Sequence, residues 1–232
     1  MKNGSLRYFV AAAGNIGAGK TTAIELLAKD LNANRALGSP WNICLEPFME
    51  NPYLAEFYKD MKSYALRAQL FFLARRSQLF RTALASERSV IFDRSPYDDA
   101  AVFALGLLEQ GVLDQRDYAL YRMVYEELIE KALPAPNLLL YFKVRPGECL
   151  CRIRERMQRE SGRDMEAGIT IEYLEALHDR YEKFIATVTC PVLVVHAEVL
   201  DPRRPDHLKL LADKMMEMLT TREEVTFDEV RP

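Results

Sequence analysis

The most constraining feature of the sequence is a glycine-rich segment near its start, GNIGAGKT at residues 14–21. It matches the pattern G-x-x-x-x-G-K-[ST], follows the apolar run 8–13 and precedes a stretch with helical spacing. Glycines let successive backbone N–H groups turn toward phosphate oxygens, and the N-terminus of the next helix adds its positive dipole. The pattern predicts a strand, loop and helix that bind the phosphates of a nucleoside triphosphate. A glycine-rich turn without a ligand is the alternative, and the flanking strand and helix argue against it.

Within this loop, two side chains carry the predicted chemistry. Lys20 is expected to reach the β- and γ-phosphates and to act in catalysis, and the hydroxyl of Thr21 is expected to hold Mg²⁺ bound with ATP. The predicted ATP-binding residues of the loop are Gly14, Asn15, Ile16, Gly17, Ala18, Gly19, Lys20, Thr21 and Thr22.

Short apolar runs alternate with longer stretches of helical spacing along the whole chain. The runs have the length and continuous apolar character of strands buried on both faces, and they cover 8–13, 42–45, 89–92, 138–144 and 192–196. The helical stretches cover 21–32, 65–86, 97–110, 115–132, 146–160, 171–187 and 205–220. This alternation predicts an α/β fold, a five-stranded parallel sheet with helices on both faces. We expect one domain over 1–222 and a frayed polar C-terminal tail over 223–232.

Composition excludes several classes of protein. With 31 basic against 34 acidic residues, the net charge of −3 argues against a strongly basic nucleic-acid binder. No apolar run reaches the roughly 20 residues needed to span a bilayer, so we expect no membrane partner. The four cysteines lack C-x-x-C spacing and lie far from the three histidines, which predicts reduced thiols in a cytoplasmic protein and no zinc site.

Polar residues follow the second and third apolar runs. Glu46 comes after the second run, where a carboxylate at the end of a parallel strand faces the ligand crevice and could accept a proton from an attacking hydroxyl. Asp93 ends the third run and is predicted to bind Mg²⁺ beside Thr21, while Arg94 could bridge Glu46 and phosphoryl oxygens. A surface acid at a strand end is the alternative for Glu46. Asp98 has a structural explanation, as part of a capping turn at the start of the next helix.

On the long helical stretch, Gln69, Phe72 and Arg76 are spaced i, i+3 and i+7 and so share one face. Two hydrogen-bonding groups and a ring suit a planar heterocycle. The alternative is a helix edge with Phe72 in the core and the polar pair in water.

Taken together, these segments resemble the deoxynucleoside kinases, especially the bacterial deoxyadenosine/deoxyguanosine kinase group. The likeness covers nearly the whole chain and rests on GNIGAGKTT, LEPF-x-ENPYL-x-x-FY, Q-x(6)-R, DRS-x-x-x-D and GRDMEAGI-x-x-EYL-x-x-LH. It implies the P-loop kinase fold with an arginine-rich lid, residues 154–168. It also implies a homodimer that transfers the γ-phosphoryl group of ATP to the 5′-hydroxyl of a deoxynucleoside in nucleotide salvage. Deoxyadenosine is favoured, with deoxyguanosine and deoxycytidine as alternatives.

The resemblance also implies a role for individual residues. Glu46 matches the general base, and Arg94 matches the arginine that pairs with it. Tyr58 and Glu166 match the residues that bind the 3′-hydroxyl. The residues that match the nucleobase site are Gln69, Arg76 and Asp99, with Phe72 and Phe103 lining its pocket, and those that match lid arginines on the phosphates are Arg156 and Arg163.

Two departures from the family pattern stand out. The lid is about five residues longer than usual and spreads its arginines over 152–163, and the segment VVHAEVLD lacks the acidic loop that packs near the adenine of ATP. We therefore assign no adenine-binding residue there and interpret His196 as a packed strand-end residue.

Two rival functions share the phosphate loop. A nucleoside monophosphate kinase of the thymidylate type has an acceptor that is already a phosphate and needs no base, so Glu46 and the DRS motif favour a hydroxyl acceptor. A catalytically inactive nucleotide-binding subunit is the second rival, and the joint presence of Lys20 and Asp93 with Glu46 argues against it.

Overall fold

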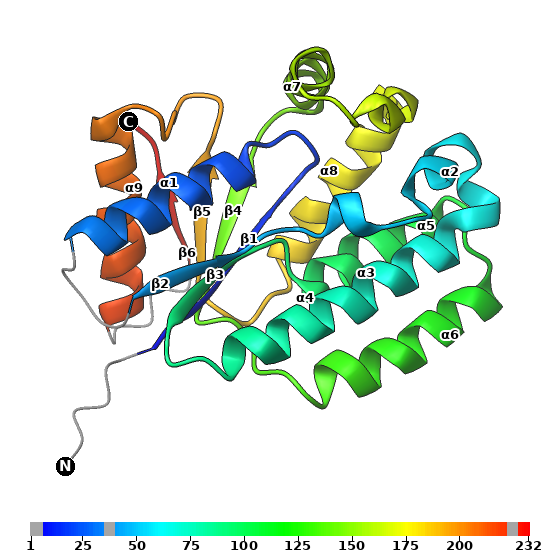
Figure 1. Cartoon of the computed structure of the whole chain (residues 1–232), viewed down its shortest axis with the longest axis horizontal. Coiled ribbons are helices and arrows are strands. Elements are labelled where there is room, and N and C mark those ends of the chain that lie inside the picture. The colour runs from blue at the N-terminus through cyan, green and yellow to red at the C-terminus, as the bar shows by residue number, and fades with distance from the viewer. Residues whose placement is uncertain (1–6, 35–39, 222–226) are drawn as a thin grey trace.

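The computed structural model describes residues 7–34, 40–221 and 227–232. Its centre is a six-stranded parallel sheet with the strand order β2-β3-β1-β4-β5-β6 (Figure 1). The strands are β1 (Phe9–Gly14), β2 (Trp41–Cys44), β3 (Ser89–Asp93), β4 (Leu138–Lys143), β5 (Val192–His196) and β6 (Phe227–Val230). The predicted α/β fold with a parallel sheet is thus confirmed.

Helices cover both faces of the sheet. On one side, α1 (Lys20–Asn34) lies against α9 (Pro205–Thr220) (Figure 1). The helical segments on the other side are α3 (Met61–Leu84), α4 (Pro96–Asp98), the π-helix η2 (Asp99–Ala104), α5 (Leu105–Glu109) and α8 (Ile171–Ile185). Outside α3 lies α6 (Gln115–Tyr125), which continues into the π-helix η3 (Glu126–Glu130).

The remaining elements surround the carboxyl ends of the strands. They are η1 (Phe48–Glu50), α2 (Leu54–Lys59), α7 (Pro146–Arg159) and η4 (Asp164–Gly168). The lid predicted over 154–168 corresponds to the end of α7 and η4. Across the described ranges, no helix combines the length and apolarity needed to span a membrane.

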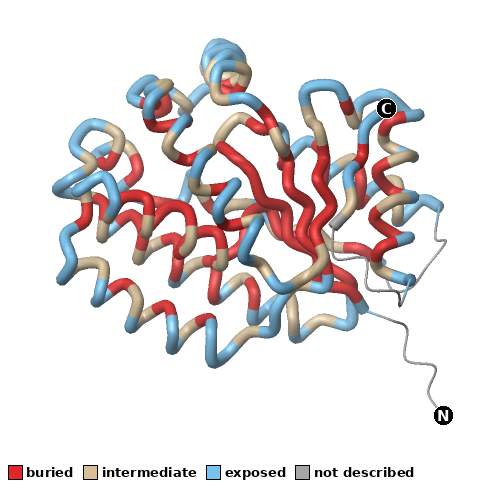
Figure 2. Tube along the Cα trace, turned by 180° about the vertical axis from the view of Figure 1, so that it is seen from behind, coloured by how far each residue is buried: buried red, intermediate tan, exposed pale blue. Residues whose placement is uncertain are grey.

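The core is built around β1, all six residues of which are buried. The strands and the helix faces turned toward them form the buried interior (Figure 2). Because β1 pairs with both β3 and β4, Ala12 lies beside Asp93 and Gly14 lies beside Phe142. This register brings the phosphate loop after β1 next to the polar residues that follow β3.

One prediction for the C-terminus is wrong. Instead of a frayed tail, residues 227–230 form β6 and extend the sheet beyond the five predicted strands. The strand has only four residues, and Val230 is the one residue described as buried in it. No continuous apolar run therefore marks this strand in the sequence. Asp228 and Glu229 are held by Lys214 at 3.2 Å and His196 at 3.0 Å. Residues 222–226 of the predicted tail lie outside the described part of the chain.

The long helix also starts earlier than its periodicity predicts. α3 begins at Met61, because the side chain of Asp60 accepts a hydrogen bond from the backbone of Ser63 at 3.2 Å. The predicted helix over 97–110 is present as α4, η2 and α5, and its π-helical middle was not predicted.

Candidate active site

A cleft of about 340 Å³ lies at the carboxyl ends of the strands, within the size range of small-molecule sites. It brings together most of the predicted site residues, from the phosphate loop, β3, α2, α3, η2 and the lid. Those lining it are Ile16, Gly17, Gly19, Lys20, Thr21, Thr22, Glu46, Tyr58, Gln69, Phe72, Arg76, Asp93, Arg94, Asp99, Phe103, Arg156, Arg163 and Glu166. The predicted loop residues outside the lining are Gly14, Asn15 and Ala18, which are buried.

The phosphate loop depends on tight backbone packing. Gly14 has φ +142°, and a Cβ there would lie 2.6 Å from the carbonyl oxygen of Phe142, so a larger residue is excluded. The ammonium group of Lys20 donates to the carbonyl oxygens of Gly14 and Asn15, both at 2.9 Å. Burial, followed by the charge of Arg94, lowers the pKa of Lys20 to about 8. A buried ammonium with only neutral acceptors is prepared for an anionic ligand.

Two oxygen groups lie together where a divalent cation is expected. The hydroxyl of Thr21 donates to Oδ2 of Asp93, and Oδ1 of Asp93 is buried without a hydrogen-bond partner. Burial raises the pKa of Asp93, and the charges of Lys20 and Arg94 only partly oppose that effect. Hard oxygen donors of this kind fit Mg²⁺. Within the described ranges, no group of three or more His, Cys, Asp and Glu residues forms another metal site.

Glu46 lies between two arginines. Its Oε1 accepts hydrogen bonds from Nε of Arg94 at 3.0 Å and from Nη2 of Arg76 at 2.6 Å. Burial acts to raise the pKa of Glu46, but the charges of Arg94, Arg76 and Lys20 outweigh it and lower the pKa to about 2. Glu46 is thus an anion at neutral pH. Its side chain is 24% exposed, which leaves it accessible from the cleft.

The other end of the cleft has the predicted nucleobase groups on α3 and η2. Nη1 of Arg76 binds Oδ1 of Asp99, and the guanidinium carbon lies 4.8 Å from the centre of the Phe72 ring. Polar atoms here are buried without partners: Oε1 of Gln69, Nε of Arg76 and Oδ2 of Asp99. Buried polar atoms are costly to leave unpaired, so their gathering in one cleft indicates that a polar ligand completes them.

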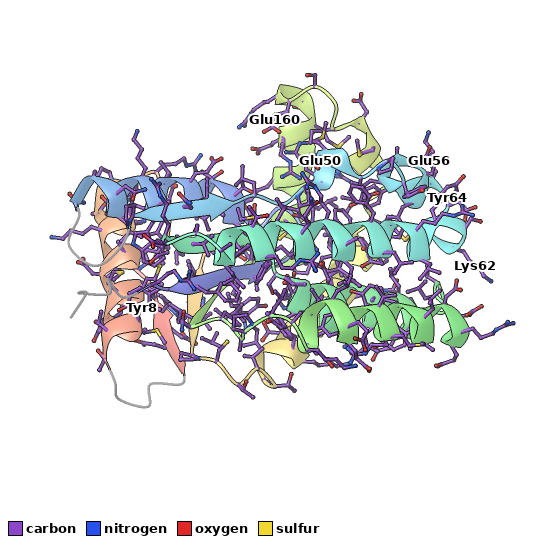
Figure 3. The ribbon with its side chains drawn as sticks, turned by 60° about the horizontal axis from the view of Figure 1, so that its bottom comes forward. Tyr8, Glu50, Glu56, Lys62, Tyr64 and Glu160 are labelled. Carbon is purple, nitrogen blue, oxygen red and sulfur yellow. The ribbon has the colours of Figure 1, made fainter. Side chains whose placement is uncertain are left out.

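The lid is docked over η1 and α2. Both Arg156 and Arg163 donate to Oε1 of Glu166, at 2.7 and 3.1 Å. The guanidinium of Arg163 also lies 4.0 Å from the centre of the Phe48 ring on η1. In Figure 3, Glu160 at the end of α7 is drawn above Glu50 of η1. The two predicted lid arginines are therefore paired with the lid glutamate in this structure.

Four residues that the sequence analysis left unassigned take part in or border the site. Tyr173 and Phe48 line the cleft, and both lie inside motifs that carried the family resemblance. Arg152 binds the carbonyl oxygen of Ala197 at 2.9 Å and lies close to the phosphate loop. Tyr181 contacts Arg94 from α8, and no sequence signal links two residues 87 positions apart.

Comparison with known proteins identifies the family. The family model described as deoxynucleoside kinase matches residues 10–220. The chain belongs to the deoxynucleoside kinase family. The kinase is therefore an ATP-dependent phosphotransferase acting on deoxynucleosides, as the motifs predicted.

Individual relatives agree with this assignment. The kinase is 32% identical to the deoxyadenosine/deoxycytidine kinase of Bacillus subtilis over 83% of each chain. It is 34% identical to the deoxyadenosine kinase of Dictyostelium discoideum, over 84% of this chain and 75% of the relative. Its structure resembles a deoxyadenosine kinase from M. mycoides with bound dATP, with a TM-score of 0.74 and 29% identity, covering 90% of this chain and 100% of the other.

Proposed function

We propose that this kinase phosphorylates the 5′-hydroxyl of deoxyadenosine, with deoxyguanosine or deoxycytidine as the alternative substrates. The relatives named deoxyadenosine kinase support this choice. So does the chemistry of the pocket, because the free oxygens of Gln69 and Asp99 can accept hydrogen bonds from an exocyclic amino group. The predicted roles of Phe72 and Phe103 as the walls of that pocket remain part of the proposal.

The observation that carries the mechanism is the clamp on Glu46. Arg94 and Arg76 bind the same carboxylate oxygen, which orients the second oxygen of a half-buried anion for a substrate hydroxyl. We propose that Glu46 accepts the 5′-hydroxyl proton as that oxygen attacks the γ-phosphorus of ATP. A base of low pKa accepts the proton late in the reaction, because the 5′-hydroxyl becomes acidic enough only once its oxygen has begun to bond to phosphorus.

The sugar is held, in this proposal, by Tyr58 and Glu166. Burial, followed by the nearby Tyr173 and Glu166, raises the pKa of Tyr58, so its hydroxyl stays protonated and can donate. Both residues line the cleft, Tyr58 from α2 and Glu166 from the lid. Their predicted contact with the 3′-hydroxyl would fix the distance between the 5′-oxygen and the phosphate loop.

Phosphoryl transfer requires cationic groups around the moving phosphate. Lys20 supplies one from the loop, and we propose that Arg156 and Arg163 exchange Glu166 for phosphate oxygens when both substrates are bound. Mg²⁺, which accompanies ATP in such kinases, would be held by Thr21 and Asp93 and would neutralise charge on the β- and γ-phosphates.

We also propose a homodimer, formed by the apolar stretches 97–110 and 117–133. Leu120 and Met123 on α6 support it, because these apolar residues are 47% and 66% exposed. Light scattering at micromolar concentration tests this: we expect the mass of a dimer for the wild type and a lower mass for Met123→Glu. A wild-type mass equal to that of a monomer would refute the proposal. A cytoplasmic location remains a proposal that rests on composition.

The test of the substrate is phosphoryl transfer from Mg²⁺-ATP to a panel of the four deoxynucleosides, the ribonucleosides and the nucleoside monophosphates. We expect fastest conversion of deoxyadenosine to its 5′-monophosphate, and a Lys20→Ala variant controls for contaminating kinases. A faster reaction with a pyrimidine deoxynucleoside would overturn the base preference. Conversion of monophosphates alone would overturn the role of Glu46.

A further inference from the structure

The inference begins with the backbone of Arg94. At φ +68°, Arg94 is the sole non-glycine residue with positive φ within the described ranges. Such a conformation is strained for a residue with a side chain and persists where the surroundings enforce it. Its amide donates to the carbonyl oxygen of Ala12 at 2.9 Å, which ties the turn to β1. The strained turn after β3 thus delivers the Arg94 side chain into the cleft.

A set of buried groups then holds the guanidinium of Arg94. Its Nε faces Glu46, and its Nη1 donates to the hydroxyl of Tyr181 on α8. Its central carbon lies 4.5 Å from the centre of the Phe103 ring. Tyr181 in turn donates to Oδ2 of Asp98 at 3.0 Å. Arg94, Tyr181 and Asp98 therefore form a chain of hydrogen bonds in which every donor points the same way.

Asp98 has two separate tasks. Its Oδ1 accepts from the backbone amide and the hydroxyl of Ser95, both at 2.7 Å, which completes the predicted helix cap. The helix cap therefore accounts for the hydrogen bonds of Oδ1 only. The other oxygen accepts from Tyr181 and lies 3.6 Å from Nη1 of Arg94. The capping role therefore fixes the carboxylate in the orientation that Tyr181 needs.

We propose that Tyr181, braced by Asp98, is a positioning residue that sets the plane of the Arg94 guanidinium against Glu46. The inference rests on the proposed roles of Glu46 and Arg94 in catalysis. A planar guanidinium can present Nε to Glu46 only while its far edge is fixed, and Tyr181 supplies that fixed contact. Burial raises the pKa of Tyr181, so its hydroxyl remains protonated and available to donate to Asp98.

The neighbouring Tyr141 provides a matched control. It is buried, its ring lies 5.9 Å from that of Tyr181, and its hydroxyl donates to Glu182 at 2.8 Å. Tyr141→Phe removes a buried hydroxyl from the same pair of stacked rings without touching Arg94. If only Tyr181→Phe loses activity, the loss is caused by the missing contact with Arg94. If Tyr181→Phe and Tyr141→Phe lose activity equally, the loss is caused by disturbed packing of the stacked rings.

The experiment measures single-turnover and steady-state transfer to deoxyadenosine in the single variants Tyr181→Phe, Tyr141→Phe and Arg94→Lys, and in the double variant that combines Tyr181→Phe with Arg94→Lys. We expect kcat of Tyr181→Phe to fall by about 10- to 100-fold, since small misplacements of reacting groups cost that much. KM for both substrates should change little, and Tyr141→Phe should keep the wild-type kcat. In an Arg94→Lys background, Tyr181→Phe should cause a much smaller loss, because both act through one group.

Several outcomes would overturn the proposal. They are a wild-type kcat in Tyr181→Phe, an equal loss in Tyr141→Phe, or the full loss retained in the Arg94→Lys background. If Tyr181→Phe fails to fold, Asp98→Asn keeps Oδ1 for the cap and removes the acceptor for Tyr181, and it should show the same selective loss of kcat. A wild-type kcat in Arg94→Lys would instead refute the proposed role of Arg94 itself.

Discussion

Replacing Glu46 with Gln tests the centre of the mechanism, because Gln keeps the shape and loses both charge and basicity. Arg94 and Arg76 hold the carboxylate in the folded protein, and they lower its pKa from 4.5 to about 2. Each pKa unit corresponds to about 1.4 kcal/mol of preference for the charged form. The ionised Glu46 therefore stabilises the fold by about 3 kcal/mol.

The sign of the pH effect follows from the direction of the shift. Because the pKa of Glu46 is lower in the folded protein, its contribution is complete above the unfolded value of 4.5 and is lost as the pH falls toward 2. Half of it is lost at about pH 3.2, midway between the two pKa values. Urea unfolding of wild type and Glu46→Gln should differ by about 3 kcal/mol at pH 7, and the difference should shrink as the pH falls below 4.5.

Catalysis should respond more strongly than stability. Loss of a general base typically lowers kcat by about 10²- to 10⁴-fold, and the affinity for ATP should change little. Glu217→Gln is the control, since Glu217 is an exposed acid on α9, outside the cleft, that binds Lys214 at 3.0 Å. It should leave both kcat and unfolding unchanged within error.

Two results would refute this reasoning. If Glu46→Gln keeps near-wild-type kcat, the hydroxyl proton leaves by another route and Glu46 is not the base. If the difference in unfolding free energy stays constant from pH 7 to pH 3.5, the two arginines do not lower the pKa of Glu46 in the folded protein.

Three further predictions concern the ligand groups and the lid. Asp99→Asn should lower kcat/KM for deoxyadenosine by about 10-fold or more, because it leaves a buried polar group unpaired, and KM for ATP should not change. Equal losses of kcat/KM for every nucleoside would mean that Asp99 supports the structure only. ATP binding should be accompanied by proton uptake near pH 8 and should weaken at higher pH, because the pKa of Lys20 is about 8 in the free protein and the phosphates favour its charged form. Calorimetry in buffers of different ionisation enthalpy measures the number of protons taken up. Binding without proton uptake would contradict this prediction. Gly168→Ala should raise KM for the nucleoside several-fold, since its Cβ would lie 2.8 Å from the carbonyl oxygen of Tyr58 and force the lid from α2. Gly147→Ala, with open space around it, is the matched control, and equal KM values in the two variants would show that lid docking does not matter.

The features that sequence analysis predicted are those encoded locally. Glycine spacing defines the phosphate loop, and apolar runs define the five strands β1 to β5, because both depend on neighbouring residues in the chain. Parallel strands then bring their carboxyl ends to one edge, so residues that follow them meet there. Glu46, Asp93 and Arg94 could be predicted to meet on that basis.

The features it missed depend on contacts between distant segments. β6 is four residues long and joins the sheet through its backbone, so no apolar run marks it. The π-helical turn of η2 is held from outside, since Arg180 on α8 donates to the carbonyl oxygen of Ala101 at 2.6 Å. The pairing of Arg156 with Glu166 required the lid to be folded back on itself, which the number of lid arginines alone does not reveal.

The arrangement of Arg76 joins the two ends of the nucleoside site. One of its terminal nitrogens binds Glu46, the proposed base, and the other binds Asp99 where the nucleobase is proposed to lie. A change at either carboxylate alters the charge balance of the same guanidinium, and through it the pKa of the other. Residues that share a partner in this way have coupled rather than additive effects. The loss of kcat in a Glu46→Gln, Asp99→Asn double variant should therefore be smaller than the product of the two single losses, because recognition of the base and removal of the proton depend on one arginine.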